Sequence, residues 1–179
     1  RLDSEQLSLF LGKRFVLTFQ DRPGDCLDPV RERIRRSRGV LRNHGPDYLT
    51  YVLLDTTIDA YFPVLEQTSE RIDELEEHIL AVSDQRTVPM IHDIKSDLLM
   101  LRRAVWPHRE MFNSMIRETT DLVSDETRAH LRDCYDHTIQ AMDVVETYRE
   151  IASSLIDVYI SSVSAKLNEI MKVLTIIST

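Results

Sequence analysis

The chain contains a long stretch, residues 124–179, with neither glycine nor proline. Because these two residues are the strongest breakers of helices, the stretch predicts one continuous helix of about 55 residues, roughly 80 Å long. Ser124 or Asp125 is suited to cap its start. A helix of this length in a chain of 179 residues requires an elongated, helix-dominated fold.

Two stripes at heptad spacing run side by side along the last part of this predicted helix. The apolar stripe has the spacing of a helix that packs along a neighbour. The polar stripe lies one residue further along the chain. It begins with a single carboxylate, and the side chains after it are mostly small and uncharged. The apolar stripe consists of Ile156, Ile160, Val163, Leu167, Ile170, Leu174 and Ile177, and the polar stripe of Asp157, Ser161, Ser164, Asn168, Met171 and Thr175.

The polar stripe has two interpretations. On periodicity alone, an ordinary solvated helix face is the commoner one. However, Lys166, Glu169 and Lys172 lie off this stripe, so the charged, solvated direction of the helix points elsewhere. The second interpretation is therefore that the polar stripe lines a narrow aqueous space.

Beyond Lys172 the sequence becomes apolar and uncharged, as it does at the start of a membrane span. Only seven residues follow this lysine, whereas a spanning helix needs roughly 20. We therefore expect at most the first turns of a span here, in a soluble piece cut from a longer protein. The charged start of the chain does not predict a signal peptide.

The net charge of −8 and the use of cysteine restrict the function classes. An acidic chain favours a divalent cation over a nucleic acid as its main partner. The arginine-rich run within residues 31–42 is the argument for nucleic acid, and a solvated face with acidic neighbours explains it better. Cys26 and Cys134 match no metal-ligand spacing and are interpreted as reduced, cytosolic thiols.

The N-terminal part predicts β structure followed by a short helix. Residues 7–11 and 15–19 are apolar runs separated by a turn at Gly12, which predicts a hairpin. Two strands alone are marginal in water, so we expect the pair to belong to a larger sheet. Asp28 is placed to cap a short helix that extends to about residue 37.

The middle of the chain predicts an antiparallel helical hairpin. Asp47 is placed to cap a long helix to about residue 81, and Pro63 should kink or divide it. The acidic run at residues 66–77 is either a solvated face or a device that concentrates cations. A 3,4 repeat over residues 91–115 predicts the second helix of the hairpin.

Four segments carry a family resemblance, in this order along the chain: residues 46–55 (PDYLTYVLLD), 101–110 (LRRAVWPHRE), 132–140 (RDCYDHTIQ) and 159–177 (YISSVSAKLNEIMKVLTII). They closely resemble the CorA magnesium transporter family, from about Phe15 to the end of the chain. The resemblance implies a homopentameric, channel-like transporter for Mg2+, and for Co2+ or Ni2+ in some members. It also implies a protein of the cell (inner) membrane, with this part on the cytoplasmic side.

The fold class expected with this resemblance is α+β and helix-dominated. Residues 1–62 would be the C-terminal part of a cytoplasmic α/β domain, built of hairpin strands plus helices. Residues 63–120 would form a long, acidic, antiparallel helical hairpin. Residues 121–179 would form a long C-terminal stalk helix that reaches the start of the first transmembrane segment.

The resemblance also implies pore-facing residues on the stalk. By position, Asn168, Met171 and Leu174 correspond to the cytoplasmic end of the pore, and Asp157 corresponds to a ring of carboxylates lower in the funnel. The polar stripe contains Asn168 and Met171 independently, whereas Leu174 falls on the apolar stripe; an aperture shared by five helices can use both. The pore-lining residues expected are Asp157, Ser161, Ser164, Asn168, Met171 and Leu174.

Members of this family also sense Mg2+ between subunits, and the matching carboxylates here are Asp55 and Asp133. The ion suits such a site because it takes oxygen ligands, keeps several waters and needs only one or two carboxylates. With Mg2+ bound the subunits would be held closed, and without it the clustered acids would repel one another. The alternative for each aspartate is an ordinary cap or surface charge.

Several features of the family are missing from these residues, including the Gly-Met-Asn motif at the pore mouth, the second transmembrane helix and the basic tail. We therefore expect no transport by this piece alone and contact with the membrane only through the absent helices. A CorA-like zinc transporter domain and a structural coiled-coil scaffold remain alternatives. No enzyme is expected, because no nucleophile–base set or phosphate-binding loop is present.

Overall fold

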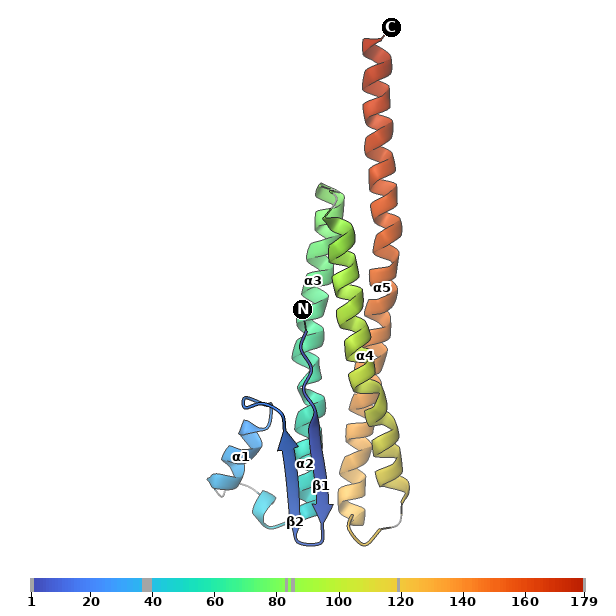
Figure 1. The fold of residues 1–179 in the computed structure, drawn as a ribbon. Helices are drawn as coiled ribbons and strands as arrows, with labels where there is room; N and C mark the ends of the chain where they lie inside the picture. Colours follow the sequence, from blue (N-terminus) through green and yellow to red (C-terminus); the bar gives the residue numbers. More distant parts are fainter. Residues whose placement is uncertain (1, 37–39, 83, 85, 119, 179) are drawn as a thin grey trace.

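The computed structural model describes residues 2–36, 40–82, 84, 86–118 and 120–178. Figure 1 shows α3 and α4 as an antiparallel hairpin that lies along the lower part of α5, while the upper part of α5 projects alone. The small sheet and α1 lie at the opposite end, beside α2. The expected α+β, helix-dominated class is confirmed. The elements are β1 (Leu7–Gly12), β2 (Phe15–Gln20), α1 (Asp28–Arg35), the 3-10 turn η1 (Val40–Arg42), α2 (Pro46–Asp59), α3 (Tyr61–Ala81), α4 (Thr87–Arg117) and α5 (Asp125–Ile177).

The predicted hairpin is confirmed as an antiparallel pair whose register runs from Leu7 opposite Gln20 to Gly12 opposite Phe15. A Cβ atom at Gly12 would lie 2.6 Å from the Phe15 ring, so the exposed ring would have to move aside for any larger residue there. One face of the pair packs on the core beside α2, and the other leaves Phe10, Phe15, Leu17 and Phe19 exposed. The larger sheet that we expect around this pair stays a prediction.

The helix α1 ends at Arg35, and the last residue predicted for it, Ser37, lies outside the described residues. Leu27 occupies the N-cap position, so the expectation that Asp28 caps this helix was wrong. Arg31 binds both carboxylate oxygens of Asp25 at 2.6 Å. Arg31 of the basic run, and Arg36, which pairs with Glu32, are thus partnered by acids, in agreement with the solvated-face interpretation.

The predicted long helix is divided at Ala60 rather than at Pro63. Pro63 lies in the first turn of α3, where its missing N–H would have had no partner within the helix. The amide of Ala60 still donates to the Thr56 carbonyl, which satisfies the end of α2. A proline signal therefore located the break to within three residues.

We had predicted that Asp47 caps its own helix, and this was wrong. Gly45 occupies the N-cap position, and no side chain caps the helix there. Asp47 Oδ2 instead accepts hydrogen bonds from the Ser124 amide (3.0 Å), the Ser124 hydroxyl (2.7 Å) and the Thr127 hydroxyl (2.8 Å). Ser124 is the N-cap of α5, as predicted, and accepts from the Thr127 amide. Burial opposes ionisation of Asp47, but these hydrogen bonds outweigh it and hold the pKa of the carboxyl below its usual value. Asp47 therefore ties the start of α2 to the start of α5.

We expect Asp47→Ala to destabilise the chain by about 2 kcal/mol, because three donors lose a charged acceptor. The measurement is the free energy of unfolding from a urea titration. Asp125→Ala is the matched control: its carboxylate is 98% exposed and pairs with Arg128 at the same helix end. That control should change stability by less than about 0.5 kcal/mol. Equal effects of the two variants would contradict a tie between α2 and α5.

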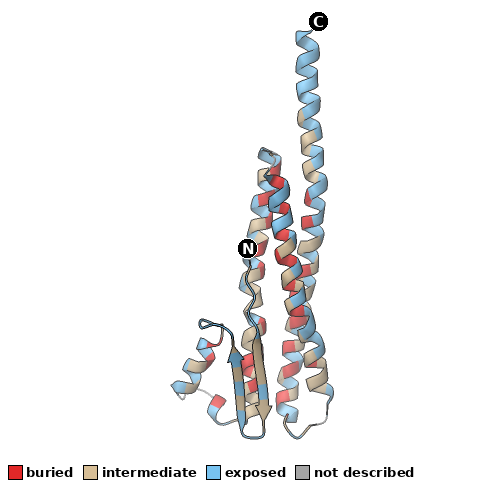
Figure 2. Ribbon diagram, viewed as in Figure 1, coloured by how far each residue is buried: buried red, intermediate tan, exposed pale blue. Residues whose placement is uncertain are grey.

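The core lies between α3, α4 and α5 (Figure 2). The α4 repeat predicted from the sequence is confirmed, with Ile91, Ile94, Leu98, Leu101, Val105 and Phe112 buried. On α5, Leu131, Thr138, Val145 and Ala152 are buried against this core. Cys134, Ala141 and Leu155 are buried as well, and Leu155 lies one residue before Ile156, the first residue of the apolar stripe.

One acidic residue of the hairpin is fully enclosed. Asp97 on α4 is only 1% exposed and accepts hydrogen bonds from Arg71 of α3 (2.7 Å) and from the amide of Leu2 (3.1 Å). Arg71 is the one cation in the acidic run of α3. The acids of this run are exposed: Glu66, Glu70, Asp73, Glu74, Glu76 and Glu77.

Candidate functional site

The helices α2 and α5 bring three potential metal ligands together. Asp55 and Asp59 are four residues apart on α2 and so share one face. His137 on α5 lies opposite them, and one ligand atom of each residue lies within 4.8 Å of the other two. Asp55 and His137 are half-buried and Asp59 is exposed. The three residues form an open group at the side of the molecule, and we call them the Asp55 group.

The environment of Asp55 disfavours its negative charge. Burial is the largest cause and the neighbouring charge of Asp59 the second, and together they raise the pKa of the Asp55 carboxyl. The buried thiol of Cys134 lies 3.5 Å from Asp55 Oδ1 and donates a hydrogen bond that only partly offsets this. Burial, followed by the charge of Asp55, raises the pKa of Cys134, so the thiol stays protonated. A cation at the Asp55 group would relieve the unfavourable charge.

His137 contributes a nitrogen to this acidic environment. Its Nδ1 atom is shielded from solvent and lies 3.5 Å from Asp59 Oδ1, without a well-formed hydrogen bond among the described residues. The ring stands edge-on to Phe62, with the ring centroids 6.3 Å apart. Carboxylate oxygens suit Mg2+, which keeps part of its water shell, and an added imidazole nitrogen also suits Co2+ or Zn2+. The donor set therefore fits a divalent cation.

Asp133, the other predicted ligand, lies one helical turn before His137 on α5. Its side chain is exposed, and its charge contributes to the raised pKa of Asp55. The structure thus places Asp133 beside the Asp55 group but outside the set of mutually close ligand atoms. Sequence reasoning missed Asp59 and His137. Two pairs at four-residue spacing, Asp55 with Asp59 and Asp133 with His137, were the signal that could have identified them.

The six predicted pore-lining residues are all exposed on α5. These are Asp157, Ser161, Ser164, Asn168, Met171 and Leu174. Asn168, Met171 and Thr175 line one shallow depression together with Lys172 and Ile176. The apolar stripe is left largely uncovered too: Leu167, for example, is 58% exposed. Apolar surface of this extent on a projecting helix indicates a partner.

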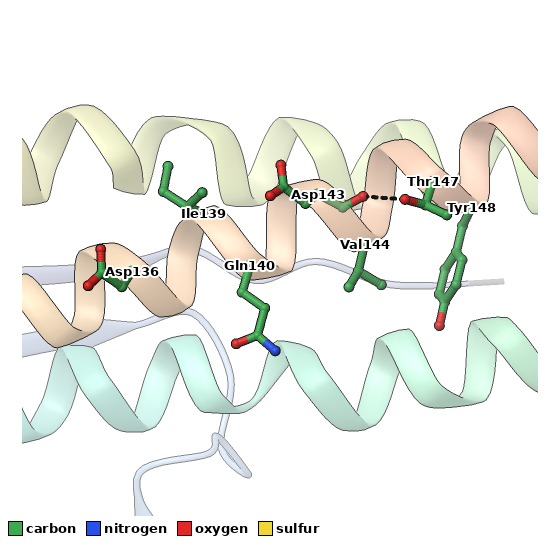
Figure 3. Close-up of a pocket in the computed structure, with 7 residues that line it drawn as sticks. All are labelled: Asp136, Ile139, Gln140, Asp143, Val144, Thr147 and Tyr148. Carbon is green, nitrogen blue, oxygen red and sulfur yellow. Dashed lines mark hydrogen bonds between the residues drawn. The ribbon is translucent and has the colours of Figure 1, made fainter.

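The polar stripe continues toward the start of α5, an extension that we did not predict. Heptad spacing extends the line of Asp157 back to Asp136, Asp143 and Glu150, and the line of Ser161 back to Gln140, Thr147 and Ser154. All six are exposed. Figure 3 shows part of this extension around a shallow pocket, where the Thr147 hydroxyl donates to the Asp143 carbonyl at 2.8 Å. The stripe is acidic along the lower half of α5 and mostly neutral along the upper half, over roughly 60 Å.

Among the residues that the structure describes, none of the helices combines the length and the apolar character that crossing a membrane requires. The projecting end of α5 is apolar only over its last turns.

Solved structures show the same fold. The complete CorA magnesium transporter from Methanocaldococcus jannaschii superposes with a TM-score of 0.77 at 21% identity, over 97% of this chain and 63% of that one. The soluble domain of CorA from the same organism superposes with a TM-score of 0.72 at 20% identity, over 90% of this chain and 72% of that one. At these identities the likeness establishes the fold alone.

Comparison at the level of sequence goes further. The chain is 52% identical over 178 residues to the cobalt/magnesium transport protein CorA of Thermotoga maritima, and this match covers 99% of the chain and 51% of the relative. The chain thus spans about half the length of that curated relative. The family described as CorA-like Mg2+ transporter protein matches residues 1–179, and the chain therefore belongs to this family.

Proposed function

We propose that this chain is the cytoplasmic metal-sensing and stalk portion of a homopentameric CorA-like transporter for Mg2+ that also accepts Co2+. The observation that carries the proposal is the exposed polar stripe of α5 beside an exposed apolar stripe. A relative named for cobalt and magnesium transport at 52% identity supports the choice of ions. The membrane would be reached through segments beyond these residues, with this part on the cytoplasmic side of the cell (inner) membrane.

In the proposed assembly, five copies of α5 surround an axis with their polar stripes turned inward. Asp157 and the acids before it would attract hydrated cations toward the axis through their combined field. Ser161, Ser164 and Asn168 would contact the hydration shell of the cation through hydroxyl and amide groups. Such neutral groups hold a hydrated cation less tightly than a carboxylate does. Met171 and Leu174 would narrow the conduit at its membrane end.

The Asp55 group supplies the proposed sensor. The described chain offers three ligands there, and Asp133 is exposed beside them, where it can share a cation with a neighbouring copy. Carboxylates of adjacent copies would repel one another without a cation and attract a shared one, so the closed ring binds Mg2+ more tightly than the open ring does. Differential affinity of this kind closes the transporter when internal Mg2+ is plentiful.

A zinc transporter of the same architecture is the second candidate. The observation that favours it is the His137 nitrogen within the Asp55 group, since imidazole is a common ligand of Zn2+ and an uncommon one of Mg2+. Comparison of Mg2+ with Zn2+ in the experiment below separates the two candidates. A larger thermal shift at a lower concentration of Zn2+ would favour the second.

We expect Mg2+ to raise the melting temperature of the chain through the Asp55 group. At ten times the dissociation constant, binding to the folded state alone adds about 1.4 kcal/mol, which is roughly 3–5 °C for a chain of this size. Asp55→Asn should abolish this rise. The measurement is thermal unfolding in EDTA and in millimolar Mg2+.

The same variant should be more stable than the parent in EDTA at pH 7. The pKa of the Asp55 carboxyl is raised in the folded state. The protonated carboxyl therefore favours the folded state, and this contribution to stability is lost as the pH rises above the pKa near 4 that the carboxyl has in the unfolded chain. Asparagine removes that loss. Glu110→Gln, on an exposed side of α4, is the control and should keep the full response to Mg2+. An Asp55→Asn protein that is stabilised by Mg2+ like the parent would contradict the sensor assignment.

A further inference from the structure

We propose that Cys134 is a positioning residue of the Asp55 group. Its buried thiol donates a hydrogen bond to one carboxylate oxygen of Asp55, holds this carboxylate in the orientation that binds a cation, and does not itself bind the cation. Since the Asp55 group is the proposed sensor, this role of Cys134 rests on the proposed function. The affinity of the sensor for its cation then depends on a side chain that never touches the cation.

The thiol of Cys134 is enclosed by three helices. The residue is fully buried, in a cluster that also contains Ile58 of α2, Phe112 of α4 and Leu131 of α5. Side chains in such a close-packed interior rest in one arrangement, because neighbouring atoms leave no room for others. A sulfur atom that is fixed in this way can fix the orientation of a group bonded to it.

The thiol bonds to another helix, whereas the nearby hydroxyl groups bond within their own. Thr56 and Thr57 of α2 and Thr138 of α5 each donate to the carbonyl four residues earlier, at 2.8 Å. This is a common arrangement for a small polar side chain in a helix. The Cys134 sulfur on α5 instead donates to Asp55 Oδ1 on α2, at 3.5 Å. The bond therefore joins the Asp55 group to the helix that faces it.

The carboxylate of Asp55 receives its orientation from this bond. Within the described part of the chain, Cys134 is the only residue that donates a hydrogen bond to it. The thiol takes one lone pair of Oδ1, so the other lone pairs of the carboxylate stay available to a cation. The ligand atoms of Asp59 and His137 lie within 4.8 Å of a carboxylate oxygen of Asp55. A carboxylate that is free to rotate would hold this arrangement for only part of the time.

A donor without net charge suits the role of orienting a metal ligand. Asp97 shows the contrasting case, since the Arg71 guanidinium lies 2.7 Å from its carboxylate and neutralises the charge that a cation would need. The thiol of Cys134 carries no charge and leaves the charge of Asp55 to the cation. Groups that hydrogen-bond to metal ligands in this way set the affinity of a site, and losing one typically weakens metal binding about 10–100-fold.

The test is thermal unfolding of the chain over a series of Mg2+ concentrations, which gives an apparent dissociation constant for each variant. Cys134→Ala removes the donor and should raise this constant about tenfold, at the lower end of the range because a thiol is a weak donor. Leu131→Val is the matched control, since it shortens a fully buried side chain of the same cluster, one turn earlier on α5. Both variants should lower the melting temperature in EDTA, but the control should keep the dissociation constant of the parent.

Co2+ in place of Mg2+ shows whether the sulfur binds the cation directly. We expect no sulfur-to-cobalt charge-transfer absorption in the parent chain, and its appearance would overturn the positioning role. A Cys134→Ala chain that binds Mg2+ like the parent, while Asp55→Asn abolishes the response, would also overturn it and would leave the sensor proposal intact. If Asp55→Asn responds to Mg2+ like the parent, the sensor proposal fails, and the role of Cys134 fails with it.

Discussion

Phe112→Ala is expected to destabilise the chain by about 3–5 kcal/mol, the largest loss that we predict for a single truncation. Phe112 is fully buried, where it contributes to a cluster with Leu54 and Ile58 of α2 and Leu131 of α5. Removing the ring both loses its transfer free energy and leaves a cavity where three helices meet. The measurement is the midpoint and slope of urea unfolding.

Trp106→Ala is the matched control for that experiment. Trp106 is on the same helix but is 48% exposed, with the Arg102 guanidinium 5.2 Å from its ring. A cation–π contact at an exposed site is worth about 0.5–1 kcal/mol, so the control should cost about that much. A similar loss in both variants would mean that α4 packs on α2 and α5 differently from the structure.

Arg71→Met is expected to destabilise the hairpin by about 3 kcal/mol at pH 7, because it leaves the Asp97 carboxylate buried without its partner. Arg71 is itself about one-third exposed, which places the effect at the lower end of the range for buried pairs. The double variant Arg71→Met with Asp97→Leu should recover most of the loss. Unfolding free energies of the four proteins complete the cycle.

The pH dependence of Arg71→Met has a definite sign. In the parent, burial opposes ionisation of Asp97, but Arg71 and the Leu2 amide outweigh it and keep the pKa of the carboxyl below its usual value. The pair therefore contributes stability above about pH 4, and that contribution is lost as the pH falls further. In the variant the pKa of Asp97 should rise, so the penalty should shrink as the pH falls from 7 toward 4. A penalty that does not change with pH would show that Asp97 is not ionised in the parent.

Local patterns were sufficient to predict most of the elements. The strand pair, the α4 repeat and the start of α5 at Ser124 depend on periodicity, turn residues and capping, which act over a few neighbouring residues. Pro63 likewise indicated the division between α2 and α3. These predictions succeeded because the interactions that decide them join residues close together in the sequence.

Long-range contacts decided what the patterns did not. Asp47 was predicted to cap its own helix, yet its Oδ2 atom accepts hydrogen bonds from Ser124, 77 residues further along the chain. The covered face of α5 contains Leu155 rather than Ile156 of the apolar stripe, because α3 and α4 reach the helix from a direction that its own sequence does not specify. Asp59 and His137 became candidate ligands only when packing of α2 on α5 brought their ligand atoms to within 4.8 Å.

The long, uninterrupted α5 and its polar and apolar stripes could be predicted from the amino acids alone, because helix propensity and heptad spacing are properties of one segment. The family could be predicted in the same way, through residues that follow one another along the chain. The packed helices were needed to learn which side of α5 is covered and which carboxylates lie near a histidine. Burial and proximity between helices depend on how separate segments pack. The sequence of one segment does not specify from which side another segment packs against it.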